Sequence, residues 1–328
     1  MTCYHIQDLR LLLPTNNFEL RINKHYSKIN QSFLEWLQEP LHGDLARTKE
    51  LSHHRFDLLC SLCFPTIDPP QLLRISKLCA LTFLANDALI QPDPSPSQWL
   101  TRDSTPYSDL LSPENLLGVV HSMRTRQAQG LQYSPCSTSG MNALRLAGNL
   151  FSFLYPPQET NTRSSRLGLL EFLVILENAY DCKFFEELTS VTLLETLWGC
   201  TMNIAMWSQD LASYGSRHPP ECGRCSVCYS IKLRGFTLQA TANDIRQSLQ
   251  SEVGKFIHNY DSLAARSWNN GDVLAAADAM RDCIAGLIHW LYEGEHHFGK
   301  QYEEVAKFGW VFMNTGGTGT SSSGVEVL

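Results

Sequence analysis

Three polar side chains are predicted to share one face of the segment 198–217. Apolar residues recur in this segment at about the 3.6-residue helical period and it contains no proline, so we expect a helix. Gln209, Ser213 and Arg217 are spaced four residues apart, which places their side chains together on that helix. They offer two neutral oxygen ligands and one cation, whereas magnesium sites depend on carboxylates. This face is therefore predicted to be a poor site for a divalent metal ion.

The surrounding sequence resembles the second metal-binding motif of fungal class I terpene synthases. In that family the motif reads Asn-Asp-x-x-Ser-x-x-x-Glu and supplies three oxygen ligands to a magnesium ion, and residues 207–214 are similar to it. Gln209 replaces the first ligand, Ser213 matches the second and Arg217 replaces the third. The resemblance implies that the family's helix is kept here with an altered metal site.

A second segment, 83–90, lies where the family has an aspartate-rich motif at the mouth of its cavity. Asn86 stands in place of the leading Asp, Asp87 matches the second, and the distal acid is replaced by Ile90 or Gln91. Asn offers a neutral oxygen but no charge, so this half of the metal site is altered as well. The alternative is that the Asn-Asp pair is only a polar helix end before a loop rich in Pro, Ser and Asp.

The residues that grip the substrate diphosphate in the family are also replaced. The Arg that senses the diphosphate there aligns with Leu176, and Tyr180 and Asp181 fall at the kink that follows it. The family's closing motif, Gly-Asn-x-x-Trp-Ser-x-x-x-x-Arg-Tyr-Phe-Gly, resembles residues 286–299, in which two histidines replace its Arg and Tyr. Both diphosphate contacts are thus predicted to be absent.

The resemblance covers roughly residues 21–310 and implies an all-α, single-domain class I terpene synthase-like helical bundle around an apolar cavity. Hydrophobic residues make up 43% of the chain, which is enough for a sizeable core. The expected parts are an N-terminal lead-in at 1–20, the helical domain at 21–312 and a flexible low-complexity tail at 313–328. Helices are predicted at 51–66, 70–91, 114–130, 137–155, 167–182, 198–217, 237–268 and 272–297.

The predicted cavity walls and mouth give a set of candidate substrate-binding residues. Aromatic faces can stabilise a developing cation, although an ordinary place in the core is the alternative for each of them. The candidates combine large apolar side chains with polar groups at the mouth, and they are Phe56, Phe83, Asn86, Tyr180, Asp181, Met202, Met206, Gln209, Ser213 and Trp290.

The same mouth is predicted to carry groups suited to proton transfer. A histidine titrates near neutral pH, and burial raises the pKa of a carboxyl group, so either type can act as a general acid or base. For the two histidines the alternative is a solvated helix end. The candidate catalytic residues are Asp87, Asp210, Glu293, His296 and His297.

These departures favour an enzyme of specialised metabolism that needs no metal ion or other cofactor. It would promote a cyclisation, rearrangement or condensation of a terpenoid, or a similarly apolar intermediate without a diphosphate, by cavity shape and acid–base help. One alternative is a Mg²⁺-dependent sesquiterpene synthase in which Asp87, Gln209 and Ser213 hold fewer magnesium ions. Another is a non-catalytic protein that carries terpenoids or partners an active cyclase.

Composition and charge indicate which partners and which cellular compartment to expect. The formal charge of −7 and the lack of a Lys/Arg-rich block argue against nucleic-acid binding. No apolar run reaches the roughly 20 residues that span a bilayer, and the N-terminus lacks the pattern of a secretory signal. Eleven cysteines, an odd number, fit a reducing compartment. We therefore expect a cytoplasmic protein, a small apolar substrate and a possible homodimer.

Three of those cysteines, Cys222, Cys225 and Cys228, are spaced three residues apart near His218. Structural zinc sites usually draw ligands from two separate pairs, and no second pair follows here. We therefore favour cysteines that pack along one stripe of a helix over a zinc site.

Overall fold

The computed structural model describes residues 3–38, 45–90, 192–217, 225–266 and 271–313, and the fold is given for these ranges. Helices dominate them, which confirms the predicted all-α class. The elements in chain order are β1 Cys3–His5, η1 Leu9–Leu12, α1 Tyr26–Leu37, α2 Leu45–His54, α3 Phe56–Cys63, α4 Pro69–Ile90, α9 Thr192–Arg217, α10 Ser226–Arg234, α11 Leu238–Ala265, α12 Gly271–Trp290, α13 Glu295–Phe298, η3 Gly299–Gln301, α14 Tyr302–Phe308 and β2 Trp310–Phe312.

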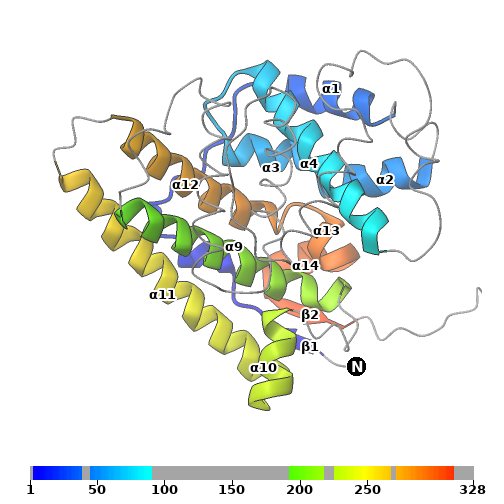
Figure 1. The fold of residues 1–328 in the computed structure, drawn as a ribbon. Helices are drawn as coiled ribbons and strands as arrows, with labels where there is room; N and C mark the ends of the chain where they lie inside the picture. The colour runs from blue at the N-terminus through cyan, green and yellow to red at the C-terminus, as the bar shows by residue number, and fades with distance from the viewer. Residues whose placement is uncertain (1–2, 39–44, 91–191, 218–224, 267–270, 314–328) are drawn as a thin grey trace, which may run out of the picture.

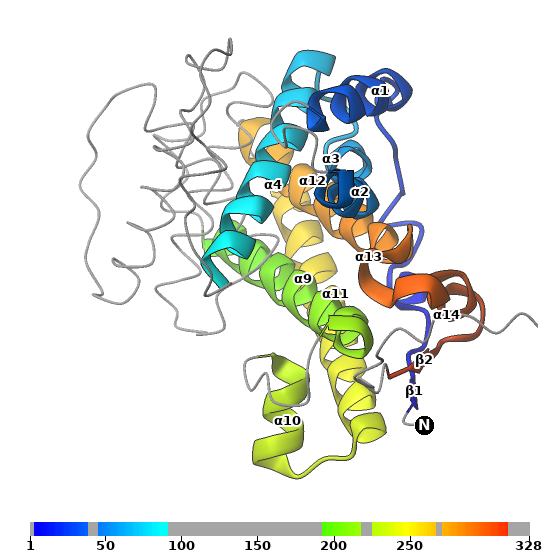
Figure 2. The same ribbon diagram turned by 90° about the vertical axis from the view of Figure 1, so that its right-hand side faces the viewer.

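Three long helices form the centre of the bundle (Figure 1). Helix α9 packs along α11 on one side and against α12 on another, and α3 packs between α12 and α4. The short helices α1 and α2 lie beside α3 and α4, and α13 follows α12 below them (Figure 2). Helix α9 contacts both α12 and α13, and α13 follows α12 in the chain. The predicted motifs at 207–214 and 286–299 therefore lie in neighbouring elements.

The core is one continuous cluster of apolar side chains drawn from almost every described element. Trp198 of α9, Phe33 of α1, Phe256 of α11 and Phe298 of α13 are among its largest fully buried members. Burying a side chain of this size contributes roughly 1.5–3 kcal/mol to folding. The apolar residues recur with the helical period because each helix directs one apolar stripe into this cluster.

A glycine of the closing motif sets the distance between α12 and α3. A Cβ atom added at Gly286 would lie 2.6 Å from the carbonyl carbon of Leu62 and 2.7 Å from the backbone nitrogen of Cys63. These neighbours are backbone atoms, which cannot move aside as a flexible side chain would. The two helices can touch at this point only because position 286 has no side chain.

The N-terminal residues are a packed part of the bundle. Strand β1 pairs antiparallel with β2, with Tyr4 opposite Val311, so the two ends of the described chain meet (Figure 1). The Tyr4 hydroxyl donates a hydrogen bond to the main-chain oxygen of Leu211 in α9. Residues of the predicted lead-in at 1–20 that are buried in the core are Tyr4, Ile6, Leu9, Leu13 and Phe18.

Two predicted helices are each divided in the structure. The segment expected as one helix at 51–66 contains the end of α2 and all of α3, which are separated by Arg55 at a positive φ of 49°. The helix expected at 272–297 ends at Trp290, and a turn containing Gly294 at φ 119° leads into α13. A positive φ interrupts an α-helix, and apolar periodicity carries no signal for it. The helices predicted between 114 and 182 lie outside the described residues.

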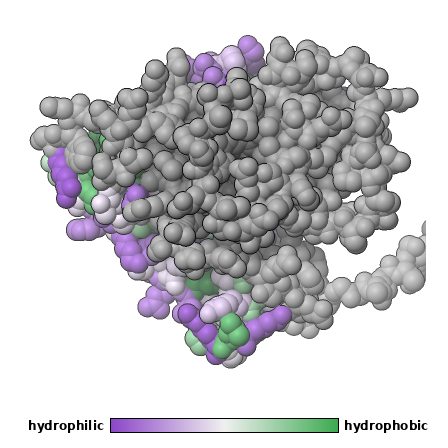
Figure 3. All heavy atoms as spheres, in the orientation of Figure 1, coloured by the Kyte–Doolittle hydropathy of each residue, from purple (hydrophilic) through white to green (hydrophobic). Residues whose placement is uncertain are grey.

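The described surface is mainly hydrophilic on the face shown in Figure 3, with an apolar area at its lower edge over α10. Leu233 of this helix is 71% exposed and Phe236 just beyond it is 37% exposed. Isolated apolar side chains of this kind are ordinary on protein surfaces. Among the described helices, none is both long enough and apolar enough to cross a bilayer.

Candidate functional site

Residues 286–299, which we call the closing segment, turn two histidines into the interior. After Trp290 the chain makes a short turn, and α13 then packs against α9 and α2 (Figure 2). His296 is only 8% exposed and His297 only 3% exposed. The alternative of a solvated helix end for these two histidines is therefore wrong.

A third histidine, His54 at the end of α2, meets His296 across the bundle. The Nδ1 atom of His54 lies 3.2 Å from Nε2 of His296, and both rings are buried. A neutral imidazole has one donor and one acceptor nitrogen, so one ring donates to the other in this contact. His54 could not be singled out from the sequence, because its neighbours Ser52, His53 and Arg55 are typical of an ordinary polar helix end.

Aromatic rings enclose this contact. The ring of Phe56 stacks on His54 with centroids 5.2 Å apart, and the Trp290 ring lies 4.9 Å from both His296 and His297. The Trp290 indole also donates to the main-chain oxygen of His54 over 3.0 Å. We call this buried set the imidazole cluster, and it consists of His54, Phe56, Trp290, His296 and His297.

Charged groups lie at the rim of the cluster. The Arg55 guanidinium donates to the main-chain oxygen of Glu293 and forms an ion pair with its carboxylate at 3.5 Å. His53 lies 3.9 Å from the Glu295 carboxylate. The side chain of Glu293 is half exposed, so this candidate acid–base residue lies at the surface while the histidines are inside.

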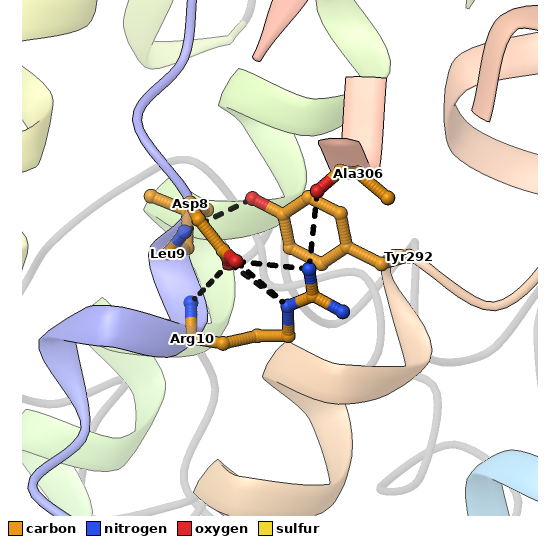
Figure 4. A network of polar contacts seen from close by, with 5 residues as sticks. All are labelled: Asp8, Leu9, Arg10, Tyr292 and Ala306. Carbon is orange, nitrogen blue, oxygen red and sulfur yellow. Dashed lines mark hydrogen bonds and ion pairs between the residues drawn. The ribbon is translucent and has the colours of Figure 1, made fainter. Parts of the chain in front are cut away.

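A polar network fixes the middle of the closing segment from the N-terminal side (Figure 4). Asp8 accepts hydrogen bonds from the main-chain N–H and the guanidinium of Arg10, and that guanidinium also donates to the Ala306 oxygen. Arg10 lies over the Tyr292 ring, 4.5 Å from its centroid, and the Tyr292 hydroxyl accepts from the main-chain N–H of Leu9. Burial raises the pKa of Tyr292, so its hydroxyl stays neutral as an acceptor at physiological pH.

Helix α9 presents a face that changes from apolar to polar along its length. Met202, Met206, Gln209 and Ser213 are spaced four, three and four residues apart and therefore share this face. The two methionines are half-buried and the two polar residues are buried. The Ser213 hydroxyl donates to the main-chain oxygen of Gln209 over 2.6 Å, and Gln209 Nε2 has no hydrogen-bond partner among the described residues.

The carboxylate of Asp210, next to this face, bonds to the start of α10. Asp210 accepts hydrogen bonds from the main-chain N–H and the hydroxyl of Ser226, at 2.8 and 2.7 Å. Ser226 is the first residue of α10, so Asp210 anchors the start of that helix. A carboxylate at a helix N-terminus is also favoured by the helix dipole. Asp210, a candidate catalytic residue, thus has a structural role in joining α9 to α10.

The groups on α9 do not fit a magnesium ion. Ser213 and Gln209 offer only neutral oxygens, so this face has no carboxylate, and the sequence holds Arg217 at the third ligand position. Magnesium sites are built from carboxylates and waters. In the described ranges, no three His, Cys, Asp or Glu side chains are arranged to hold a metal ion.

The remaining candidates fall into two groups. Phe83, Asn86 and Asp87 lie in the last turns of α4, and their side chains are outside the described part of the structure. Tyr180 and Asp181, together with the segment around them, lie outside it altogether. The structure therefore brings together Phe56, Trp290, His296 and His297 of the predicted set, and it places Met202, Met206, Gln209 and Ser213 on a single helix face.

The cysteine segment departs from the predicted helical stripe. Cys225 precedes α10 with an extended backbone, and its sulfur accepts from the main-chain N–H of Cys228 at 3.3 Å. Burial raises the pKa of the Cys225 thiol, which favours its neutral form. Cys228 lies within α10 and is buried, whereas Cys222 is outside the described residues. Cys225 therefore caps the helix instead of packing within it.

Comparisons with known proteins agree with this fold. No protein-family model matches the chain. It is 22% identical to Sesquiterpene synthase Agr1 of Cyclocybe aegerita over 88% of this chain and 87% of that protein. It is also 22% identical to Sesquiterpene synthase 1 of Postia placenta over 88% of this chain and 89% of that protein.

Solved structures extend the likeness to the fold. An α-eudesmol synthase matches with a TM-score of 0.59 and 13% identity, over 86% of this chain and 98% of that one. The germacradien-4-ol synthase from Streptomyces citricolor matches with a TM-score of 0.56 and 18% identity, over 84% of this chain and 96% of that one. The chain therefore has the class I terpene synthase fold and is a divergent, terpene synthase-like relative of the fungal sesquiterpene synthases.

Proposed function

We propose that the protein is an atypical terpene cyclase-like enzyme that acts on a terpenoid, or a similarly apolar intermediate, without a diphosphate. It promotes cyclisation, rearrangement or condensation by acid–base catalysis inside an apolar cavity, and no metal ion or other cofactor takes part. The relatives named as sesquiterpene synthases, which match 88% of the chain, support a terpene cyclase-like activity. The finer points of the proposal rest on the residues of this chain.

The observation that carries the proposal is the chemistry of the α9 face. Ionising a prenyl diphosphate requires strong electrostatic stabilisation of the leaving group, which magnesium and arginine usually provide. The positions that resemble the family's ligands hold Gln209, Ser213 and Arg217, and the nearby carboxylate of Asp210 is engaged with Ser226. The positions that resemble its diphosphate contacts hold His296 and His297. A substrate whose activation needs only a proton fits this set better.

Histidine limits which proton transfer is feasible. A protonated imidazole can donate to an oxygen atom but is too weak an acid to protonate an alkene carbon. We therefore favour an oxygenated terpenoid, such as an epoxide. The imidazolium N–H gives its proton to the epoxide oxygen, the C–O bond breaks, and an alkene electron pair forms the new C–C bond. The resulting cation loses a proton from carbon to the neutral imidazole, so the catalyst is restored and the product is an isomer of the substrate.

The first experiment is incubation of the full chain with farnesyl and geranylgeranyl diphosphates and with the 10,11-epoxide of farnesol as a probe. Each substrate is tested with magnesium and with EDTA, and products are identified by mass spectrometry. We expect an isomer of the epoxide in both conditions and no hydrocarbon from either diphosphate. A magnesium-dependent hydrocarbon or alcohol from a diphosphate would overturn the proposal.

The acid–base part has its own test with two variants and a matched surface control. His296→Ala and Asp87→Asn should each reduce turnover of the epoxide, because each removes a group that can exchange a proton. Glu304→Gln changes an exposed carboxylate on α14 and should keep turnover. If both site variants turn over as fast as the unaltered chain, acid–base catalysis by these groups is wrong.

A magnesium-dependent sesquiterpene synthase is the second candidate, and the names of the relatives favour it. In this case Asp87, Gln209 and Ser213 hold fewer magnesium ions than in the family. Calorimetry with magnesium and pyrophosphate would detect this binding. A non-catalytic role is distinguished by lack of turnover together with co-purification of an active cyclase.

A further inference from the structure

We infer that His54 is a positioning residue that acts through His296 by fixing which ring nitrogen of His296 exchanges a proton. The pairing of the two rings stands on geometry alone. Its role in turnover rests on the proposed function.

The geometry constrains the protons of the pair. His54 Nδ1 and His296 Nε2 lie 3.2 Å apart, and the ring centroids are 3.7 Å apart with the planes inclined at 58°. One proton must lie between the two nitrogens for this to be a hydrogen bond. Two positive charges at this distance in a buried place would repel strongly, so the pair carries at most one charge.

The position of the shared proton determines the chemistry of the outer nitrogens. In the singly charged pair, the other protons are on Nδ1 of His296 and Nε2 of His54. When His296 gives up its Nδ1 proton, the shared proton stays on its Nε2 and continues to point at His54. Nδ1 of His296 is then an acceptor, ready to take a proton back. His54 thus assigns the exchange of protons to Nδ1 of His296, as the orienting group of a catalytic base does.

The surroundings hold His54 in place for this task. Phe56 stacks on its ring with the planes only 8° apart, and the Trp290 indole binds its main-chain oxygen. Arg55 breaks the helix immediately after it at a positive φ, and its guanidinium reaches Glu293 and the Tyr26 hydroxyl. A group whose own rotamer is locked by packing is well suited to orient a second group.

Among the described residues, the charged groups at the rim of the pair are paired with one another. At the rim, Arg55 faces Glu293, and His53 faces Glu295. Helix α9 packs against α13, and the polar side chains of its motif are the neutral Gln209 and Ser213 and Asp210, which bonds to Ser226; on α14, Glu303 accepts from Tyr302. Among the described rings, the one nearest to His296 apart from His54 is that of His297, with centroids 4.2 Å apart. His297 is therefore the one titratable group inside the described cluster that competes with His54.

Two variants separate positioning from packing. His54→Asn keeps a hydrogen-bonding atom near the place of Nδ1, whereas His54→Leu removes it and keeps an apolar side chain of similar bulk. Both retain the main-chain oxygen that accepts from Trp290. His53→Gln is the control, since it changes the neighbouring, half-exposed histidine at the rim.

The decisive measurement is nitrogen NMR of the full chain labelled with ¹⁵N in histidine, without substrate. The His296 signals are assigned with His296→Gln. In the neutral form we expect the unaltered chain, His54→Asn and His53→Gln to carry the His296 proton on Nε2. His54→Leu should give a mixture of both tautomers. A single unchanged tautomer in His54→Leu, or an Nδ1–H tautomer in the unaltered chain, would overturn the inference.

Turnover gives a second arm that separates this inference from the proposed function. With an active substrate, His54→Leu should lower kcat by roughly tenfold or more with little change in KM and alter the pH profile, and His54→Asn should restore most of the rate. Equal kcat values and pH profiles in the unaltered chain and His54→Leu would overturn the catalytic role. If the tautomer pattern is as expected but no chain turns over an epoxide, the positioning stands and the proposed function fails.

Discussion

Changing Tyr292 to phenylalanine removes one hydrogen-bond acceptor from the buried junction between the N-terminal turn and the closing segment. The Tyr292 hydroxyl accepts from the main-chain N–H of Leu9 at 3.0 Å, and Leu9 is only 1% exposed (Figure 4). Phenylalanine keeps the ring beneath the Arg10 guanidinium, so the cation–π contact is retained. The ion pair of Arg10 with Asp8 does not involve the hydroxyl and is retained as well.

The expected loss is that of leaving one buried donor without its acceptor. This costs about 1–3 kcal/mol in the free energy of unfolding. With a urea m-value on the order of 3 kcal/mol/M for a chain of this size, the unfolding midpoint should fall by about 0.3–1 M. The m-value itself should not change, because the same surface is exposed on unfolding.

The measurement is urea unfolding at neutral pH, followed by tryptophan fluorescence. Tyr302→Phe is the matched control, since its hydroxyl bonds to Glu303 at the surface, where water can replace it. We expect no measurable change in the midpoint of that variant. An unchanged midpoint in Tyr292→Phe, or an equal fall in both variants, would refute the argument that this buried hydrogen bond fixes the junction.

Two further predictions concern stability. Gly286→Ala should lower the free energy of unfolding by about 1–3 kcal/mol, because its Cβ would overlap the backbone of α3, whereas Gly254→Ala on α11 meets no atom within 4 Å and should raise it by about 0.4–1 kcal/mol. Urea unfolding measures both, and equal signs would contradict the packing argument. Burial raises the pKa of Tyr260 and of Cys200 to about 12 each, so their contribution to stability is complete below about pH 9 and is lost as the pH rises toward 12. The urea midpoint should therefore be lower at pH 10.5 than at pH 8. Equal midpoints would refute the raised pKa values of these two groups.

The helical class and several motif positions could be predicted because they depend on local pattern. The segment 198–217 is helical as predicted, within a longer α9, because its apolar residues follow the helix period into the core. The resemblance of the closing segment also placed Gly286 and the two histidines in one motif, which the structure divides between α12 and α13. These features depend on residues that are close together in the sequence.

What could not be predicted depends on contacts between distant parts of the chain. His54 and His296 are 242 residues apart, and no local pattern joins them. The division between α2 and α3 at Arg55 arises where its side chain reaches Tyr26 and the closing segment. The packing of the N-terminal residues was likewise hidden, because the strand they form is completed by β2 at the other end of the described chain.

Helix α9 keeps the acid of the motif that it resembles, but that acid does not lie on the ligand face. An acid is present in the motif at Asp210, directly after the first ligand position at Gln209. Successive residues on a helix point about 100° apart, so Asp210 cannot take the place of Gln209 on the face shared with Ser213. Its carboxylate instead meets the N–H and hydroxyl of Ser226 and holds α10. The helix therefore keeps the acid of the motif that it resembles in a structural contact with α10, while the motif's third ligand position holds Arg217 in place of Glu, and this loss of a carboxylate is what favours the proposed proton transfer over ionisation of a diphosphate.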